Sequence, residues 1–372
     1  MPAYIRTSAV FCPLGHHTET IFEQMMAGRH AFVPRHFGTE QKQEMVAAIP
    51  ENMWQLLNET FPQQQFTVFE KMCLFVAQQA IIESQINPTS AECLFVLSTT
   101  KGNIAELGQQ PDERVNLWTS AQQITGYFQN PNRPLVVSNA CISGVLALIL
   151  AKDAIENNQY KHIIVIGADM LSGFVLNGFQ SFLALSDKPC RPFDADRNGL
   201  NLGEAAACII LSREAGDTKI PIKITGGGLS NDANHLSGPS RSGEELAAAI
   251  KMALKEADVS EQDIDFLSAH GTATRYNDEM EAKALALAGV SHAPLHSLKS
   301  YLGHTLGAAG IIETLFDAHC MKKGILLPSL NFSKTDAPVH VCQNPQNKII
   351  RHLLKTASGF GGCNAALVLE RG

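Results

Sequence analysis

The stretch "VSNACISGVLALIL", residues 137–150, joins a β-branched apolar run to an apolar run with helical spacing. The preceding "PLVV" (134–137) favours a buried strand, and "GVLALILAKDAIENN" (144–158) favours a helix that is apolar first and polar afterwards. Cys141 is therefore expected in the first turn of that helix, in a bend made of small residues. Such a thiol is either an ordinary buried side chain or a nucleophile held in place for chemistry.

Strand-like and helix-like runs alternate along the chain, which favours an α/β protein. In the first part, strands are predicted over 91–100, 133–140, 161–169 and 205–212, and helices over 18–28, 70–84 and 143–158. The polar run "REAGDTK" (213–219) marks the boundary between two expected domains, 1–217 and 218–372. The second contains predicted strands over 221–230, 264–270 and 295–300, helices over 242–258 and 306–324, and a closing segment over 355–370.

The two parts share a weak internal similarity. In both "VVSNACISGVLALIL" (136–150) and "SLKSYLGHTLGAAGIIETL" (297–315), a short strand runs through small residues into an apolar helix. Two equivalent βα halves would bring these two junctions near a common centre, which is where ligands collect in such sheets.

Composition excludes several classes of function. The net charge of −7, without a basic block, argues against a nucleic-acid partner. No apolar run is long enough to span a membrane, and the N-terminus lacks the pattern of a signal peptide. The nine cysteines are irregularly spaced without a C-x-x-C pair, so we expect a cytosolic protein whose thiols are reduced and mostly buried.

Cys141 has features that suit a nucleophile. A thiol at a helix N-terminus feels the positive end of the helix dipole, which favours the thiolate, and its backbone N–H can bind an oxyanion. Gly144 would allow another segment or a ligand to approach closely. The alternative from these residues alone is a small buried hydrophobe.

Two further motifs contain histidines. In "SAHGTATRYNDEMEAKAL" (268–285), His270 ends a strand and the hydroxyls of Thr272 and Thr274 follow on a turn, where they could bind an amide-bearing ligand. Asp278 and Glu281 lie three residues apart on the next helix, hence on one face. A strand-end histidine is more often structural, and two acids on one helix face are more often solvated.

His304 precedes a helix that opens with "GAAG", and Lys299 lies five residues upstream on the expected strand. The alternative is an exposed lysine and a packed histidine. In "SGFGGCNAALV" (358–368), glycines including Gly359 and Gly361 surround Phe360 and permit a tight turn before a closing strand. This turn is either a plain hairpin or a set of backbone N–H groups aimed at an anion, with Phe360 as a movable apolar gate.

Nucleotide and metal motifs are missing or incomplete. "DADRNGLNLGEA" begins like a calcium loop at Asp194, but Ala205 stands at the twelfth position, where such a loop needs a bidentate acid. Neither a Walker motif nor a strand-linked G-x-G-x-x-G occurs, so neither ATP nor NAD is expected.

Together these motifs closely resemble the elongating β-ketoacyl-[acyl-carrier-protein] synthases of the type II, dissociated kind. "VSNACISG", "RPFDADRNGLNLGEAA", "AHGTAT", "LKSYLGHTLGAAG" and "GFGGCNAALV" occur in the family's order, and the resemblance covers nearly the whole chain. It implies the thiolase fold, an α/β architecture with two pseudo-equivalent βα halves in a layered αβαβα core. The first half would carry the nucleophile, and the second the two histidines and the Gly-Phe-Gly loop.

The resemblance also implies a role for each residue. Cys141 would accept the acyl group, His270 and His304 would complete a Cys-His-His triad, and Lys299 would organise the site. Asp278 and Glu281 match acids of the network that holds the lysine. Thr272 and Thr274 match threonines that bind the phosphopantetheine arm. Phe360 matches the gating residue between Gly359 and Gly361, and Phe179 matches a second gate residue.

These residue types fit a decarboxylative condensation. The Cys141 thiolate would take the acyl group from acyl carrier protein, with the oxyanion bound by the N–H groups of Cys141 and Phe360. Two neutral imidazoles would then stabilise the enolate formed as malonyl-carrier protein loses CO₂, and its attack would extend the chain by two carbons. Initiating synthases pair one histidine with asparagine and thiolases add a second cysteine, so both are disfavoured. The resemblance implies a dimer and requires neither a metal nor a redox cofactor.

Two departures from the family pattern bear on the pathway. The span from "STTKGN" to Cys141 is short, and the helix that usually offers a basic cluster to the carrier reads "FPQQQFTVFEKM", with Lys71 almost its only cation. We therefore hypothesise a pathway-specific synthase, for instance for a polyene or another secondary lipid. Three alternatives stay open: a non-catalytic chain-length factor, a heterodimer in which this chain is the catalytic half, and a thiolase-fold acyltransferase that never decarboxylates malonate.

Overall fold

A large mixed sheet of eleven strands forms the centre of the protein in the computed structural model, which describes residues 2–37, 43–108, 113–233 and 238–372. Its first half consists of β1 (Ala3–Phe11), β4 (Cys93–Ser98), β5 (Leu135–Val137), β6 (His162–Asp169) and β7 (Ala205–Ser212). Its second half consists of β8 (Ile222–Asn231), β9 (Phe266–Ser268), β10 (Pro294–His296), β12 (His340–Val341), β14 (His352–Gly359) and β15 (Cys363–Arg371).

The two halves of the sheet repeat one topology. The strand order is β5-β4-β6-β7-β1 in the first half and β10-β9-β14-β15-β8 in the second, with β12 added at the edge. In each half three strands pair in parallel, and the remaining pairings are antiparallel. The pairs Ala3↔Ile224 and Tyr4↔Lys223 join β1 to β8 and make the sheet continuous.

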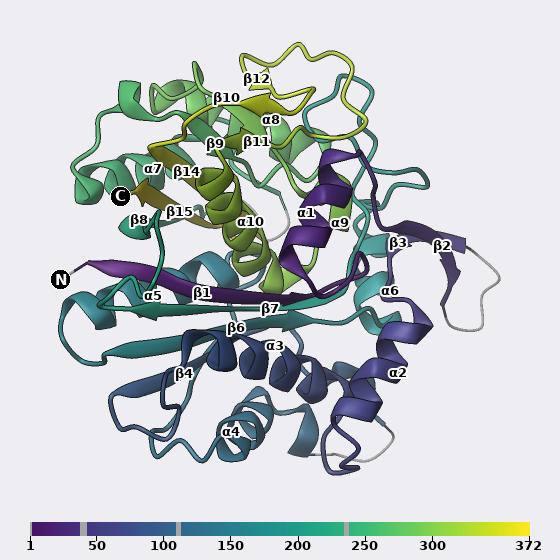
Figure 1. Ribbon diagram of the computed structural model, residues 1–372. Helices are drawn as coiled ribbons and strands as arrows, with labels where there is room; N and C mark the ends of the chain where they lie inside the picture. The colour runs from purple at the N-terminus through teal and green to yellow at the C-terminus, as the bar shows by residue number, and fades with distance from the viewer. Residues whose placement is uncertain (1, 38–42, 109–112, 234–237) are drawn as a thin grey trace.

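Helices form three layers around this sheet (Figure 1). Between the two halves lie α5 (Ser143–Glu156) and α10 (Ala309–Lys323), which contact each other and strands of both halves. The outer face of the first half is covered by α3 (Val68–Ser84), with α4 (Leu117–Tyr127) beside it, and that of the second by α7 (Glu244–Ala257), with α8 (Arg275–Leu287) packed on it. This arrangement confirms the predicted α/β class and its αβαβα layering.

The remaining elements are short or peripheral. They are α1 (Thr18–Met26), α2 (Glu51–Thr60), α6 (Gly173–Ser181), α9 (Lys299–Leu302), the hairpin β2 (Phe32–His36) and β3 (Gln43–Ala47), the pair β11 (Ile325–Leu326) and β13 (Gln346–Asn347), and the 3₁₀ turns Ile104–Glu106, Glu113–Val115, Glu261–Asp263 and Leu306–Ala308. Within the described ranges, no helix has both the length and the apolar character that a membrane crossing needs.

One predicted strand is wrong in part. The strand expected over 295–300 ends at His296, and Lys299 begins the helical turn α9 instead of lying on a strand. The ladder stops because the N–H of Ser297 donates to the Ser329 hydroxyl (2.8 Å) and not to a neighbouring strand. Leu298 then already has helical dihedral angles. The chain therefore turns here, which directs Lys299 and His304 back into the protein.

All nine cysteines are buried and free, as expected for reduced thiols in a protein core. Eight of them are therefore ordinary candidates for packing roles, and the surroundings of Cys141 must set it apart.

Candidate active site

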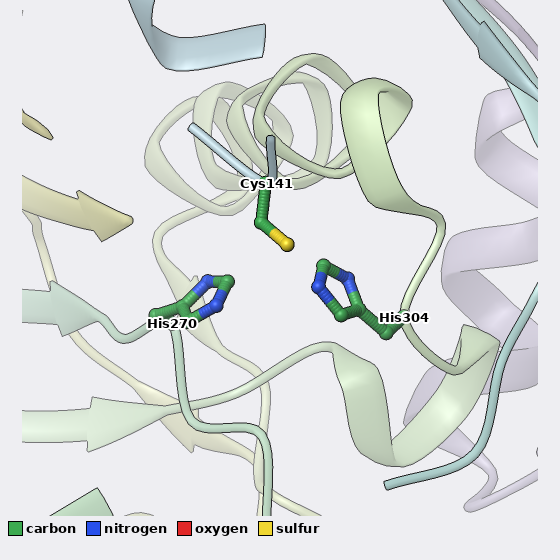
Figure 2. A group of neighbouring side chains, drawn as sticks. All are labelled: Cys141, His270 and His304. Carbon is green, nitrogen blue, oxygen red and sulfur yellow. The ribbon is translucent and has the colours of Figure 1, made fainter. Parts of the chain in front are cut away.

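Three side chains from different parts of the chain meet in one buried cluster. Cys141 lies in the turn between β5 and α5, His270 follows β9, and His304 lies between α9 and the 3₁₀ turn before α10. Their sulfur and ring nitrogen atoms lie within 4.8 Å of one another. Figure 2 shows the sulfur of Cys141 pointing into the space between the two imidazoles, whose centroids are 5.3 Å apart.

The turn that holds Cys141 is tight and closed by a hydroxyl. Ala140 has the left-handed φ of 45°, which costs an L-residue about 1–2 kcal/mol. The Ser143 hydroxyl donates to the carbonyl of Ala140 (2.6 Å) and accepts the N–H of Asn139 (2.7 Å). Helix α5 begins only at Ser143, so the prediction that Cys141 lies in its first turn is wrong by two residues.

The expectation that the helix dipole favours a resting thiolate is also corrected. Burial raises the pKa of the Cys141 thiol to about 12, because desolvation penalises the charged form and outweighs the opposing effect of Lys299. Cys141 is thus a neutral thiol at pH 7, and its proton must be removed during a reaction.

Both histidines are neutral as well. Burial lowers the pKa of His304 to about 3 and that of His270 well below its usual range, and the charge of Lys299 adds to both shifts. The N–H of Leu306 donates to Nδ1 of His304 (3.3 Å), so in the neutral ring the proton is on Nε2. Nε2 of His304 is buried without a hydrogen-bond partner among the described residues, which leaves a free donor beside the thiol.

Lys299 is paired with an acid that was not predicted from the sequence. Its Nζ lies 2.6 Å from Oε1 of Glu313 on α10, and Nζ of Lys355 on β14 lies 2.7 Å from Oε2 of the same carboxylate. Burial is the largest single effect and raises the pKa of Glu313, but the charges and hydrogen bonds of the two lysines together outweigh it and lower this pKa to about 2. Glu313 is therefore the carboxylate that neutralises Lys299.

Asp278 and Glu281 instead hold the loop that carries His270, which corrects their expected contact with Lys299. Glu281 accepts the N–H groups of His270 and Gly271 (2.8 Å each) and the Thr356 hydroxyl. Asp278 accepts the N–H groups of Phe193 (2.7 Å) and Thr272 (3.0 Å), and burial raises its pKa to about 7. Their oxygens are used mainly by backbone donors of Phe193 and of residues 270–272, and among the described residues neither acid forms an ion pair with Lys299.

Asp169 links the two halves of the protein close to the cluster. At the end of β6 it accepts the hydroxyl of Thr99 (2.9 Å), the N–H of Thr100 (2.9 Å) and the N–H of Gly307 (2.7 Å), three residues after His304. The segment after His304 is thereby fixed to the first half of the sheet.

A cavity of about 600 Å³ leads to the cluster. Cys141, His270 and His304 line it together with the following residues of the predicted set: Thr272, Thr274, Phe179, Phe360 and Gly359. The hydroxyls of Thr272 and Thr274 are hydrogen-bonded to each other (2.9 Å). Lys299, Asp278, Glu281 and Gly361 do not line the cavity.

Aromatic rings stand beside this cavity. The ring of Phe360 lies 5.5 Å from that of Phe179 and 5.1 Å from that of Phe182, between centroids, and the Phe179 ring lies 6.5 Å from His304. Phe182 at the end of α6 was not predicted. The rings of Phe182 and Phe360 are partly exposed.

The Gly-rich turn lies against the nucleophile. A Cβ at Gly359 would stand 3.0 Å from the backbone N of Cys141 and 2.9 Å from Sγ of Cys363. Gly361 has a φ of +86°, which favours glycine. The turn can therefore approach Cys141 closely because Gly359 lacks a side chain.

A metal would meet an unfavourable charge here. A thiolate and two imidazoles at this spacing are ligands that Zn²⁺ uses. The positive charge of Lys299, which acts on all three residues, opposes a divalent cation.

The segment 194–205, whose sequence begins like a calcium loop, uses its first acid for backbone contacts. The Asp194 carboxylate accepts the N–H groups of Asp196 (2.9 Å) and Ser333 (2.6 Å), so it holds the loop together.

Comparisons with known proteins give one family for this arrangement. The family model "Beta-ketoacyl synthase, N-terminal domain" matches residues 4–216, and "Beta-ketoacyl synthase, C-terminal domain" matches residues 222–333. The chain is 35% identical to 3-oxoacyl-[acyl-carrier-protein] synthase 2 of Rhizobium meliloti over 70% of this chain and 66% of that protein. It is 30% identical to the protein of the same name from Coxiella burnetii over 70% and 67%. The alignments thus span about two thirds of these relatives.

Two solved structures match the fold of this chain over nearly its whole length. The ishigamide ketosynthase/chain length factor has a TM-score of 0.91 at 26% identity and covers 99% of this chain and 98% of that chain. A ketosynthase in complex with its chain length factor from Xenorhabdus doucetiae has a TM-score of 0.84 at 25% identity, with 100% and 98% covered. The family models together cover most of the chain, and this chain therefore belongs to the β-ketoacyl synthase family of condensing enzymes.

Proposed function

We propose that this chain catalyses the decarboxylative condensation of an acyl-enzyme thioester with malonyl-carrier protein. The observation that carries this proposal is the meeting of the Cys141 thiol with two neutral imidazoles, His270 and His304, at the end of a cavity. A thiol supplies the nucleophile, and neutral imidazoles supply hydrogen-bond donors for an oxyanion.

The first step is acyl transfer to Cys141. The sulfur attacks the thioester carbonyl of an acyl-carrier protein, the N–H groups of Cys141 and Phe360 bind the oxyanion, and the carrier thiolate leaves. The Cys141 proton ends on that leaving thiolate. In neutral His304, Leu306 occupies Nδ1 and the proton is on Nε2, so His270 is the imidazole that relays the proton.

The second step is decarboxylation and condensation. The bond between the malonyl α-carbon and its carboxylate breaks, CO₂ leaves, and the electron pair forms a thioester enolate. Nε2–H of His304 donates to the enolate oxygen, together with a donor from His270. The α-carbon attacks the acyl-enzyme carbonyl, the Cys141 thiolate leaves, and it takes up one proton, giving a β-ketoacyl chain two carbons longer.

The surrounding residues have supporting roles in this proposal. Thr272 and Thr274 bind the phosphopantetheine arm, because both residues line the cavity and carry hydroxyls. Phe360, flanked by Gly359 and Gly361, opens and closes the path to Cys141 with Phe179. Lys299 organises the charge around the histidines, and Asp278 and Glu281 position the His270 loop.

We further propose that the substrates arrive on acyl carrier protein, that the chain needs no metal or redox cofactor, and that it acts in the cytoplasm as a dimer. Its domains would be 1–217 and 218–372. A specific observation favours a heterodimer in which this chain is the catalytic half: the two structures described above, at 26% and 25% identity, are ketosynthases with chain length factors. The chain has the cysteine, both histidines and the lysine of a catalytic subunit.

The proposal extends to a pathway-specific synthase. Lys71, the main cation of the helix expected to meet the carrier, is only 8% exposed and donates to Asn58 (2.9 Å). It is thus unavailable to an acidic carrier, which supports a different docking surface. The shortened span before Cys141 includes 109–112, which lie outside the described residues. Equal turnover of saturated and of polyunsaturated acyl-carrier proteins would contradict this specialisation.

Intact-mass measurement tests the first step. The protein is mixed with a panel of saturated, unsaturated and aryl-capped acyl-carrier proteins, and Cys141→Ala is the matched control. We expect a gain of one acyl group in the wild type alone, largest for the natural substrate. Acylation that persists in Cys141→Ala would overturn the assignment of the nucleophile.

A further inference from the structure

Lys355 is a buried cation that no step of the proposed reaction uses. It lies on β14 with its side chain fully buried, and it faces Ser268 of β9 in the parallel ladder. Ser268 is two residues before His270, so Lys355 lies beside the strand that leads to this histidine. Neither its position nor its partner was predicted from the sequence.

The Lys355 ammonium group is held rigidly. Its Nζ donates to the carbonyls of Thr356 (2.8 Å) and Ser268 (3.3 Å) and pairs with Oε2 of Glu313 (2.7 Å). The three donors of an ammonium group are thus all used. Since Lys299 takes Oε1 of Glu313, one carboxylate bridges two buried lysines.

This bridge carries an excess of one positive charge. Among the residues that the structure describes, Lys299 and Lys355 form their ion pairs with Glu313 alone. Glu281 faces the same region from α8 and accepts the N–H groups of His270 and Gly271 and the Thr356 hydroxyl. These donors are neutral, so the carboxylate of Glu281 opposes the charge of the bridge from a neighbouring position. Lys355 and Lys299 nevertheless share the single carboxylate that both contact directly, so Glu313 cannot fully neutralise either lysine.

A second buried lysine shows the contrast. Lys152 on α5 is equally buried, but its Nζ contacts three carboxylates, those of Asp153 (3.2 Å), Glu156 (2.8 Å) and Glu256 (2.6 Å). The charge of Lys152 is therefore more than balanced, and none of these groups belongs to the cluster around Cys141.

The charge of Lys355 acts on the histidines. It adds to the lowered pKa of His270 after burial, Lys299 and His304, and it adds to the lowered pKa of His304 after burial and Lys299, where Glu313 opposes with a larger effect than that of Lys355. Positive charge there opposes an imidazolium and favours an anion in the same water-poor space. The enolate formed as CO₂ leaves is such an anion, whereas the malonyl thioester carbonyl before the reaction is neutral.

We propose that Lys355 is a positioning residue for decarboxylation: it takes one oxygen of Glu313, so this carboxylate cannot fully neutralise Lys299, and the positive charge that remains near His270 and His304 favours the thioester enolate. This inference rests on the proposed function, and it adds to that function a residue that touches no substrate.

The test compares Lys355→Met with Lys152→Met, which removes an equally buried lysine outside the site. For Lys355→Met, we expect kcat for condensation to fall roughly tenfold and the acid limb of its pH profile to rise by about one pH unit. Lys152→Met should leave both unchanged in the folded protein. An unshifted pH profile in Lys355→Met would overturn the inference, and so would an equal shift in Lys152→Met.

A second readout separates this inference from the proposed function. Anionic iodoacetate and neutral iodoacetamide both alkylate Cys141 with loss of iodide, and the ratio of the two rates reports the electrostatic potential at the thiol without any acyl substrate. We expect Lys355→Met to lower this ratio roughly tenfold, and an unchanged ratio would contradict the charge effect. If the wild type lacks synthase activity but the ratio falls, the proposed function fails and the charge effect stands. Should Lys355→Met not fold, Lys355→Arg, which keeps the charge, must retain the wild-type ratio.

Discussion

Gly144 of α5 and Gly310 of α10 lie in direct backbone contact, because a Cβ built on Gly144 would stand 2.9 Å from the backbone of Gly310. This contact lies close to the cluster, because Cys141 stands just before α5 and His304 stands shortly before α10. The small residues of both segments are therefore a condition for bringing thiol and imidazole together.

Gly144→Ala should consequently destabilise the protein by about 1–3 kcal/mol, since the added methyl group must push the helices apart. Urea unfolding measures the change in the free energy of unfolding. Gly126→Ala is the control: Gly126 lies in α4 with open space around its Cα, and alanine there should be neutral or stabilising by up to about 1 kcal/mol. Equal stability of the two variants would contradict the packing argument.

His304→Ala should separate the two chemical steps. The variant loses the Nε2–H donor for the enolate, so we expect malonyl decarboxylation to fall by about 10²–10³-fold, while acylation of Cys141 changes little. CO₂ release and intact mass measure the two steps separately. His292→Ala, at an exposed histidine, is the control. If both steps fell equally in His304→Ala, the role given to this histidine would be wrong.

Glu281→Gln should loosen the His270 loop. A glutamine offers one acceptor oxygen where two backbone N–H groups and the Thr356 hydroxyl converge, so we expect a loss of about 1–3 kcal/mol in stability. We also expect kcat to fall more than KM rises, because the loop positions an imidazole. Glu279→Gln, on the same helix at a 55% exposed side chain, should behave like the wild type. A wild-type kcat in Glu281→Gln would argue against this positioning.

His304 should also contribute to the pH dependence of stability. Its pKa is about 3 in the folded protein, against 6.5 for an ordinary histidine, so the unfolded chain binds more protons between these values. Stability from this group is therefore lost as the pH falls from 6.5 toward 3, by up to about 1.4 kcal/mol per pH unit. His304→Gln should flatten this part of a plot of unfolding free energy against pH. An unchanged slope would mean that His304 titrates normally in the folded protein.

Asp278 acts in the opposite direction. Its raised pKa of about 7 means that the folded protein holds a proton that the unfolded chain releases above its ordinary value of 3.8. Stability from this group is lost as the pH rises from 3.8 to 7. In Asp278→Asn, the free energy of unfolding should therefore fall less over this pH range than in the wild type.

The sequence was sufficient for the fold class and the cluster, but not for the charge network. Periodicity predicted the α/β class, and the family resemblance carried by the motifs implied the layered fold and singled out Cys141, His270 and His304, which the structure brings together. Glu313 and Lys355 were missed because each is a single charge inside an apolar element. Such a lone charge in "GIIETL" or "HLLKTA" is itself a signal, since a buried charge requires a partner, but the partner is distant in sequence.

The position of Lys299 is a second feature that could not be predicted from the sequence. A short strand was expected over 295–300, yet the N–H of Ser297 donates to the Ser329 hydroxyl, 32 residues away, and the ladder ends there. The resting charge of Cys141 was misjudged for a related reason. Desolvation depends on the whole surrounding fold, whereas the dipole of a neighbouring helix is visible in the local sequence.

The central claim is tested most directly by following one turnover with malonyl-carrier protein. Acyl-loaded protein is mixed with malonyl-carrier protein, and both CO₂ and the mass of the carrier-bound product are measured. We predict one CO₂ for each chain extended by two carbons, with no extension in Cys141→Ala. An acyl group that moves from Cys141 to a carrier without CO₂ release, or extension that persists in Cys141→Ala, would contradict the account.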